Sequence, residues 1–213
     1  PYYGATDTEE LQLRHDLMRA KLSGYMEKPQ TVLARYPASD TSLPAQYARA
    51  IATFNSKGIE AALPLIDQLI EARPGYAYFY EVKGDLLLRK GDAARAIPPL
   101  RKARKLSDHG LIRIQLAEAL LRSGDRAVVD EAVDLLQKSL VQEEQSSGYR
   151  QLANAYYLRG EEGLAYLATA RASLLEGKLT DAKAFAKRSQ TFFASGSPSW
   201  IKADDIIALK SPE

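Results

Sequence analysis

A helix-turn-helix pattern recurs in this chain of 213 residues with a period of 34 residues. Ala62 and Pro64 return as Ala96 and Pro98, and the turn at 57–58 returns at 91–92. A unit of this length, two helices and a turn, cannot bury its apolar face alone and becomes stable by stacking on its neighbours. The period therefore predicts an all-α solenoid of helical hairpins, and such solenoids usually bind partners instead of catalysing reactions.

Composition narrows the class of protein further. Hydrophobic residues make up 46% of the chain, which is enough for a sizeable core. The 29 Lys and Arg residues nearly balance the 27 Asp and Glu residues, so a nucleic-acid-binding protein is disfavoured. Cysteine is absent, which excludes disulfides and thiolate metal sites, and no apolar run is long enough to span a bilayer.

The two ends of the chain depart from the repeat. Residues 1–42 are predicted to form an irregular helical pair packed on the solenoid. Its first helix is expected to be capped near Asp7 and to run to Gly24, and its second is expected to begin at Pro29, since proline is tolerated in a first helical turn. Residues 196–213 are predicted to form a capping helix, opened by a Ser-Pro pair, and a tail.

Between these ends we expect four repeats in what is a single domain overall. Ala132 follows Ala96 by 36 residues instead of 34, so residues 126–129 are expected to absorb a short insertion. The helix at about 162–176 is expected to serve two neighbouring pairs. The period is that of the tetratricopeptide class, which implies a right-handed superhelix with a C-terminal capping helix. The repeats are expected at about 43–76, 77–109, 110–145 and 146–195.

Three prolines fall inside predicted second helices. Proline inside a helix removes a backbone hydrogen bond and clashes with the preceding turn, at a cost of roughly 3 kcal/mol. Two interpretations are open for Pro64, Pro98 and Pro99: a tolerated kink at one position of the repeat, or helices that begin later than the pattern suggests.

The sequence contains no catalytic or metal-binding motif. Its two histidines, His15 and His109, fit no metal-ligand spacing. His15 is expected on an exposed helix face, and His109 is expected to contact free carbonyl groups at the end of a helix. Nucleophile elbows, phosphate-binding loops and dinucleotide fingerprints do not occur. The chain is therefore predicted not to be an enzyme and to hold no cofactor or metal of its own.

A partner-binding groove is expected on the inner face of the stack, where the first helix of each repeat lies. Tyrosine and arginine are enriched at binding hot spots and both recur there, although some of these side chains would instead pack against neighbouring repeats. A clamp for a C-terminal carboxylate is disfavoured, because Glu81 and Asp85 occupy two of its positions. The candidate groove residues are Tyr47, Ile51, Phe54, Tyr78, Glu81, Asp85, Arg89, Glu118, Arg122, Arg150, Asn154 and Tyr157.

Four segments near the chain ends are more specific than the repeats between them: Pro1–Asp7, Leu11–Asp16, Arg19–Gly24 and Gly196–Ile206. Together they resemble the C-terminal tetratricopeptide region of bacterial zinc metallopeptidases related to HtpX and BepA. The resemblance spans essentially the whole chain. In that family a signal peptide and an HExxH catalytic domain precede the repeats, the enzyme works in the periplasm, and the repeats recruit envelope substrates or assembly machinery.

The resemblance implies a function that the residues alone do not. It implies that this chain is the substrate- or partner-recruiting domain of a periplasmic zinc-dependent metalloprotease in envelope protein quality control, with Pro1 near the domain junction. Zinc is expected in the upstream catalytic domain, because the HExxH motif does not occur here and no zinc ligand can be carried over. Outer-membrane proteins or their assembly machinery are the implied partners.

Two other interpretations stay open. The chain could be a free-standing tetratricopeptide adaptor or scaffold, with no enzyme attached. Alternatively, the repeats could act on the protease itself, as a plug or as an oligomerisation surface.

Overall fold

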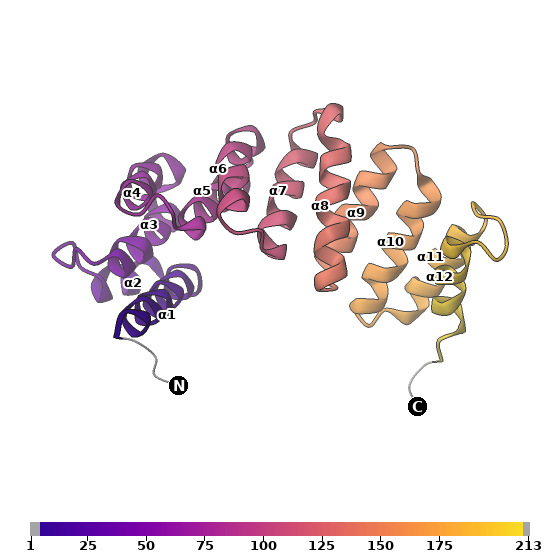
Figure 1. Ribbon diagram of the computed structural model, residues 1–213, viewed down its shortest axis with the longest axis horizontal. Helices are drawn as coiled ribbons and strands as arrows, with labels where there is room; N and C mark the ends of the chain where they lie inside the picture. The colour runs from indigo at the N-terminus through magenta and orange to yellow at the C-terminus, as the bar shows by residue number, and fades with distance from the viewer. Residues whose placement is uncertain (1–4, 211–213) are drawn as a thin grey trace. The chain divides into compact units, whose positions relative to one another are not determined.

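The computed structural model describes residues 5–210, and in this range the chain forms α-helices and one short 3-10 turn, with no strand (Figure 1). The chain divides into two compact units, which are residues 1–91 and 92–213. The division falls at the turn inside the repeat predicted for 77–109. The expectation of a single domain stays a prediction.

Unit 1 is organised around α3. The helix α3 packs against α1, α2 and α4, and α4 packs in turn against α5. The first helix already begins at Ala5, ahead of the cap expected near Asp7. The helices are α1 (Ala5–Met26), α2 (Pro29–Arg35), α3 (Leu43–Lys57), α4 (Ile59–Ala72) and α5 (Ala77–Lys90).

Local chemistry sets the ends of α3 and its approach to α1. The backbone N–H of Ala45 donates to the Ser42 hydroxyl at 3.4 Å, which caps the start of α3. Gly58 ends α3 with φ 85°, a conformation that other residues rarely adopt. A Cβ atom at Gly24 would lie 2.8 Å from Cβ of Ile51, so glycine is what allows α1 to lie this close to α3.

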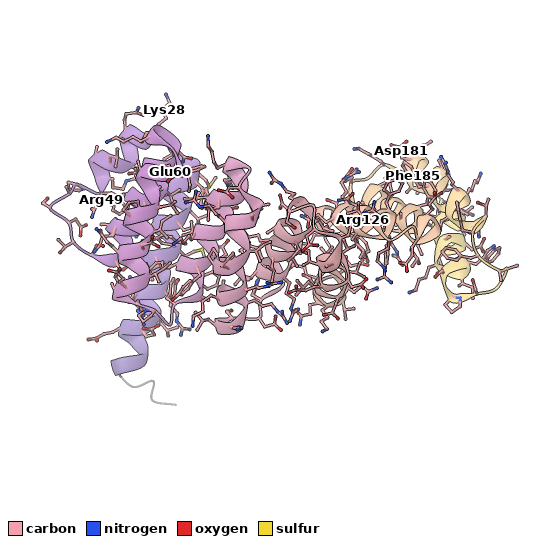
Figure 2. The ribbon with its side chains drawn as sticks, turned by 90° about the horizontal axis from the view of Figure 1, so that it is seen from above. Lys28, Arg49, Glu60, Arg126, Asp181 and Phe185 are labelled. Carbon is pink, nitrogen blue, oxygen red and sulfur yellow. The ribbon has the colours of Figure 1, made fainter. Side chains whose placement is uncertain are left out.

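The connection from α2 to α3 is held by one arginine. Arg49, which Figure 2 labels, extends from α3 toward this connection. Its Nη1 atom donates to the carbonyl oxygens of Pro37 at 2.7 Å and Asp40 at 2.8 Å. This charged donor adds to the backbone hydrogen bond of the segment itself, in which the Asp40 N–H donates to the Pro37 carbonyl oxygen at 3.0 Å, and so helps to fix the connection.

Unit 2 is a succession of helices in which each packs on the next, and Figure 1 shows α7 to α10 side by side. The 3-10 turn lies where the insertion at 126–129 was predicted, and α10 packs on both α9 and α11, as expected. The elements are α6 (Ala93–Leu106), α7 (Gly110–Arg122), η1 (Arg126–Val128), α8 (Val129–Gln142), α9 (Ser146–Leu158), α10 (Glu162–Leu175), α11 (Leu179–Gln190) and α12 (Pro198–Ala208).

The last helix forms as the sequence predicted. The Ser197 hydroxyl accepts a hydrogen bond from the backbone N–H of Trp200 at 3.4 Å, and Pro198 occupies the first turn of α12. Ala203 and Ile206 are buried against α10 and α11. The apolar stripe of α12 therefore closes the end of the core of unit 2.

The prolines lie inside continuous helices. Since α4 begins at Ile59 and α6 at Ala93, the interpretation that these helices begin after the prolines is wrong. Pro64 and Pro98 are exposed, and Glu60 and Ala94, whose carbonyl groups lose a helical partner, are exposed as well. Exposure places these positions on the water-facing side of their helices, which lowers the cost of the missing hydrogen bonds.

Candidate partner-binding surfaces

Two of the predicted groove residues belong to the core of unit 1, which corrects their assignment to an open surface. Tyr47 is 1% exposed, its ring packs edge-on against Phe79, and its hydroxyl donates to the carbonyl oxygen of Tyr78 at 3.2 Å. Ile51 is completely buried, and Phe54 is half-buried. The repeat pattern marked their position in the helix but not the helices that cover them.

The other predicted residues of unit 1 meet side chains of α1. Lys21 Nζ lies 2.6 Å from Oε2 of Glu81, a side chain of which only 3% is exposed. The Tyr25 hydroxyl donates to Oδ2 of Asp85 at 2.6 Å, and Arg89 Nε donates to the same oxygen at 2.8 Å. We call these five residues the α1–α5 network.

The α1–α5 network also contains a contact between a cation and an aromatic ring. The Arg89 guanidinium lies 4.8 Å from the centroid of the Tyr25 ring, which is a cation–π geometry. Burial is the main cause that raises the pKa of Tyr25 far above its ordinary value, and the Asp85 carboxylate is the second cause. The Tyr25 hydroxyl therefore stays a donor. Glu81 and Asp85 therefore join α5 to α1.

Sequence reasoning missed the α1 side of this network because α1 lies outside the regular repeats. A signal was nevertheless present. Lys21 and Tyr25 are four residues apart on α1, and Glu81 and Asp85 are four residues apart on α5. Residues four apart lie on one face of a helix, so the two pairs can meet when the two faces meet.

The remaining groove candidates lie in unit 2, on α7 and α9. Arg122 Nη1 donates to Oε1 of Glu118 at 3.0 Å, within one turn of α7. Gln151 Nε2 donates to Oε2 of Glu118 at 3.4 Å, which links α9 to α7. Glu118 thus accepts hydrogen bonds from its own helix and from α9, whereas the Arg122 side chain stays exposed.

Arg150, Asn154 and Tyr157 share one face of α9, because they are separated by four and then three residues. We call them the α9 face. Arg150 makes a two-point ion pair with Glu176, with nitrogen–oxygen distances of 2.7 and 2.6 Å. Asn154 is exposed, and Tyr157 is 67% exposed, which is unusual for so large an aromatic side chain.

The ion pair of Arg150 gives a pH prediction. The hydrogen bond with Arg150, followed by the hydrogen bond with Lys178, lowers the pKa of Glu176 from 4.5 to about 2. The pair therefore contributes to stability above pH 4.5, and this contribution is lost as the pH falls through about 2. A carboxyl carbon NMR titration should give a pKa of about 2 for Glu176 and a clearly higher value in the Arg150→Ala variant. The Arg122→Ala variant is the control and should leave this pKa unchanged, whereas a pKa near 4.5 in the unaltered chain would contradict the ion pair.

A hollow with a volume of about 670 Å³ lies on other residues of unit 2, between α8, α9, α10 and α12. We call it the α8–α12 pocket. None of the α9-face residues lines it. Its walls are mostly apolar or aromatic, with two cationic side chains and one carboxylate. They are formed by Gln137, Leu140, Val141, Glu144, Tyr149, Leu152, Tyr156, Leu164, Leu167, Ala168, Arg171, Ser199 and Lys202.

Each of the two histidines contacts a residue close to it in the chain. His15 is exposed on α1, as expected, with Nδ1 3.4 Å from Oδ1 of Asp16. His109 was predicted to contact carbonyl groups at the end of α6. It instead caps the start of α7, where its Nδ1 accepts a hydrogen bond from the backbone N–H of Leu111 at 3.3 Å. Among the side chains of residues 9–210, no three His, Asp or Glu groups gather as metal ligands would. Within residues 5–210, no helix has the length and apolar character needed to cross a membrane.

Comparison with known proteins gives one group of relatives by sequence, although no family model matches the chain. The Beta-barrel assembly-enhancing protease of Escherichia coli (strain K12) is 28% identical over 139 residues, which are 65% of this chain and 28% of that protein. The protein of the same name from Yersinia pestis is 28% identical over 142 residues, which are 66% of this chain and 29% of that protein. The chain spans less than a third of the length of these curated relatives.

Comparison with solved structures identifies the fold. The structure titled MamA MSR-1 C2 aligns with a TM-score of 0.61 and 20% identity, over 81% of this chain and 99% of that chain. The structure titled MamA AMB-1 P212121 aligns with a TM-score of 0.59 and 20% identity, over 80% and 93% of the two chains. Together with the helical hairpins, this likeness confirms the predicted all-α, tetratricopeptide-like solenoid fold class. Folds of this class generally mediate protein–protein interactions.

Proposed function

We propose that this chain is a protein-recruiting domain of a periplasmic zinc-dependent metalloprotease, and that the α9 face binds the recruited polypeptide. The observation that carries the binding site is Tyr157, a large aromatic side chain that is 67% exposed beside the exposed Asn154. Tyrosine is among the residues that contribute most to protein interfaces, because its ring offers apolar area and its hydroxyl offers a hydrogen bond.

The protease context is supported by sequence similarity. The curated relatives are called assembly-enhancing proteases, and the chain matches less than a third of their length. In this proposal zinc and the catalytic groups belong to another part of the polypeptide, and this chain supplies the docking surface. The periplasm is the proposed compartment, and outer-membrane proteins or their assembly machinery are the proposed partners.

Photo-crosslinking in cells tests the docking surface. A benzophenone amino acid at position 154 or 157 of the complete polypeptide is expected to crosslink proteins that mass spectrometry identifies as outer-membrane proteins or their assembly factors. The same group at Thr180 or Lys187, both exposed on α11, is the matched control in the same unit. Crosslinks that are as strong at the control positions would move the site away from the α9 face.

Substitution separates recruitment from catalysis. The double variant Asn154→Ala and Tyr157→Ala, which carries no crosslinking residue, is expected to weaken binding of the partners identified by crosslinking about thirtyfold in pull-down measurements, which corresponds to the roughly 2 kcal/mol of one hot spot. Its hydrolysis of a short peptide should be unchanged, because a short peptide needs no docking. A complete polypeptide that binds no zinc and cleaves no protein would instead establish a free-standing adaptor.

A further inference from the structure

We propose that the α8–α12 pocket is a second binding site, which takes a polypeptide segment carrying both apolar and acidic side chains. It rests on the proposed function in that the ligand is again a polypeptide. It uses none of the residues of the α9 face, however, so the two sites can be tested separately.

The walls of the pocket supply the apolar part of the argument. Leu140, Leu152 and Leu167 are buried beneath it, whereas Val141 at its edge is 88% exposed. Apolar surface thus continues from the floor to the open rim. The volume of about 670 Å³ lies within the range of sites that hold ligands. Burying this surface under apolar side chains of a partner would be favourable.

The charged groups of the pocket supply the acidic part. Arg171 comes from α10 and Lys202 from α12, and neither makes an ion pair with a side chain of residues 9–210. The single carboxylate, Glu144, accepts a hydrogen bond from the Tyr149 hydroxyl at 2.6 Å. Two cations that make no ion pair therefore lie beside the apolar floor, and acidic side chains would complement them.

Two of the neutral polar side chains in the pocket, Gln137 and Tyr156, already contact each other. Gln137 Nε2 donates to the Tyr156 hydroxyl at 2.7 Å. Burial is the main cause that raises the pKa of Tyr149 to about 12, and the hydrogen bond to Glu144 is the second cause. The phenol therefore stays a neutral donor to Glu144. Recognition of a charged ligand would therefore depend on Arg171 and Lys202.

An anionic membrane surface fits the pocket less well than a polypeptide. Segments that bind anionic lipids usually present clusters of roughly four to eight basic residues, whereas this pocket has two. Its apolar groups also line a hollow between helices, which suits side chains of a folded or extended segment better than a flat interface.

A peptide-binding measurement tests the proposal. The probe is a synthetic amphipathic peptide of about three helical turns, with leucine on one face and glutamate at its border, and binding to the purified chain is followed by fluorescence anisotropy. A second peptide has glutamine in place of glutamate. We expect the glutamate peptide to bind at least about fivefold more tightly at low salt, and the difference to shrink as salt is added.

Variants of the chain locate the binding. Arg171→Gln with Lys202→Gln should remove most of the difference between the two peptides, and Val141→Asp should weaken the glutamate peptide without loss of core packing, because Val141 is exposed. Lys183→Gln with Lys187→Gln on α11 makes the same change in net charge outside the pocket and should have no effect. Circular dichroism checks that each variant is folded.

The outcomes distinguish this proposal from the proposed function. Equal binding of both peptides, or an unchanged difference in the Arg171 and Lys202 variant, would overturn it. Binding to phosphatidylglycerol vesicles without binding to the glutamate peptide would also overturn it, in favour of a lipid surface. A loss of peptide binding in the Asn154 and Tyr157 double variant, with none in the pocket variants, would place the peptide on the α9 face and support only the proposed function.

Discussion

Tyr47→Ala is expected to lower the free energy of unfolding of unit 1 by about 4 kcal/mol. Tyr47 is 1% exposed, and its ring packs against Phe79 with a centroid distance of 5.1 Å. Truncation removes the buried ring, leaves a cavity and deprives the Tyr78 carbonyl of the hydroxyl that donates to it. Urea-induced unfolding, followed by circular dichroism, measures this loss.

Tyr47→Phe is the matched control, because it removes only the hydroxyl. We expect it to cost about 1 kcal/mol, the typical contribution of one hydrogen bond. If Tyr47→Ala unfolded with the same midpoint as the unaltered chain, Tyr47 would have to lie on an open surface. The sequence-based interpretation of Tyr47 as a groove residue would then be restored.

The second large effect concerns the ion pair that joins α1 to α5. Lys21→Met is expected to lower the free energy of unfolding by about 3 kcal/mol, because the Glu81 carboxylate, with 3% of its side chain exposed, loses a cation at 2.6 Å. The methionine retains most of the apolar stem of the lysine, so the loss is chiefly electrostatic. The measurement is again the unfolding transition in urea.

Two further variants show whether that loss of stability comes from the buried Glu81 carboxylate. Combining Lys21→Met with Glu81→Leu should recover part of the loss, because no carboxylate then remains buried beside the methionine. Lys138→Met removes an ion pair with Asp134 in which both side chains are more than half exposed, and it should change stability by less than about 1 kcal/mol. Equal costs for Lys21→Met and Lys138→Met would show that Glu81 does not depend on Lys21.

Much of the fold could be predicted from the sequence because its signals are local. The Gly58 turn and the cap at Ser197 are set by residues close to them in the chain, and the structure places helix ends at both. The displaced Ala132 likewise predicted the irregular turn before α8. His109 was assigned to the wrong helix, since a residue between two helices can cap either of them.

The surfaces were harder to predict because they depend on which helix covers which face. Tyr47 and Tyr157 both lie on first helices of repeats, yet Tyr47 is buried and Tyr157 is 67% exposed. The α1–α5 network depends on a helix outside the repeats, and the α8–α12 pocket is assembled from four helices. The repeat period of a single sequence does not show which helices contact one another. That any of these surfaces binds a partner stays a prediction.

The contrast between the contacts of the two units bears on the order in which each can fold. In unit 2 the helices pack on the next helix or the next but one, so structure can grow by short loop closures, which are fast. In unit 1 the contacts of Lys21 with Glu81 and of Tyr25 with Asp85 join residues 60 positions apart. These contacts can form only after a long loop has closed, at a larger entropic cost. The network should therefore be a late event in the folding of unit 1, and its loss should accelerate unfolding more than it slows folding.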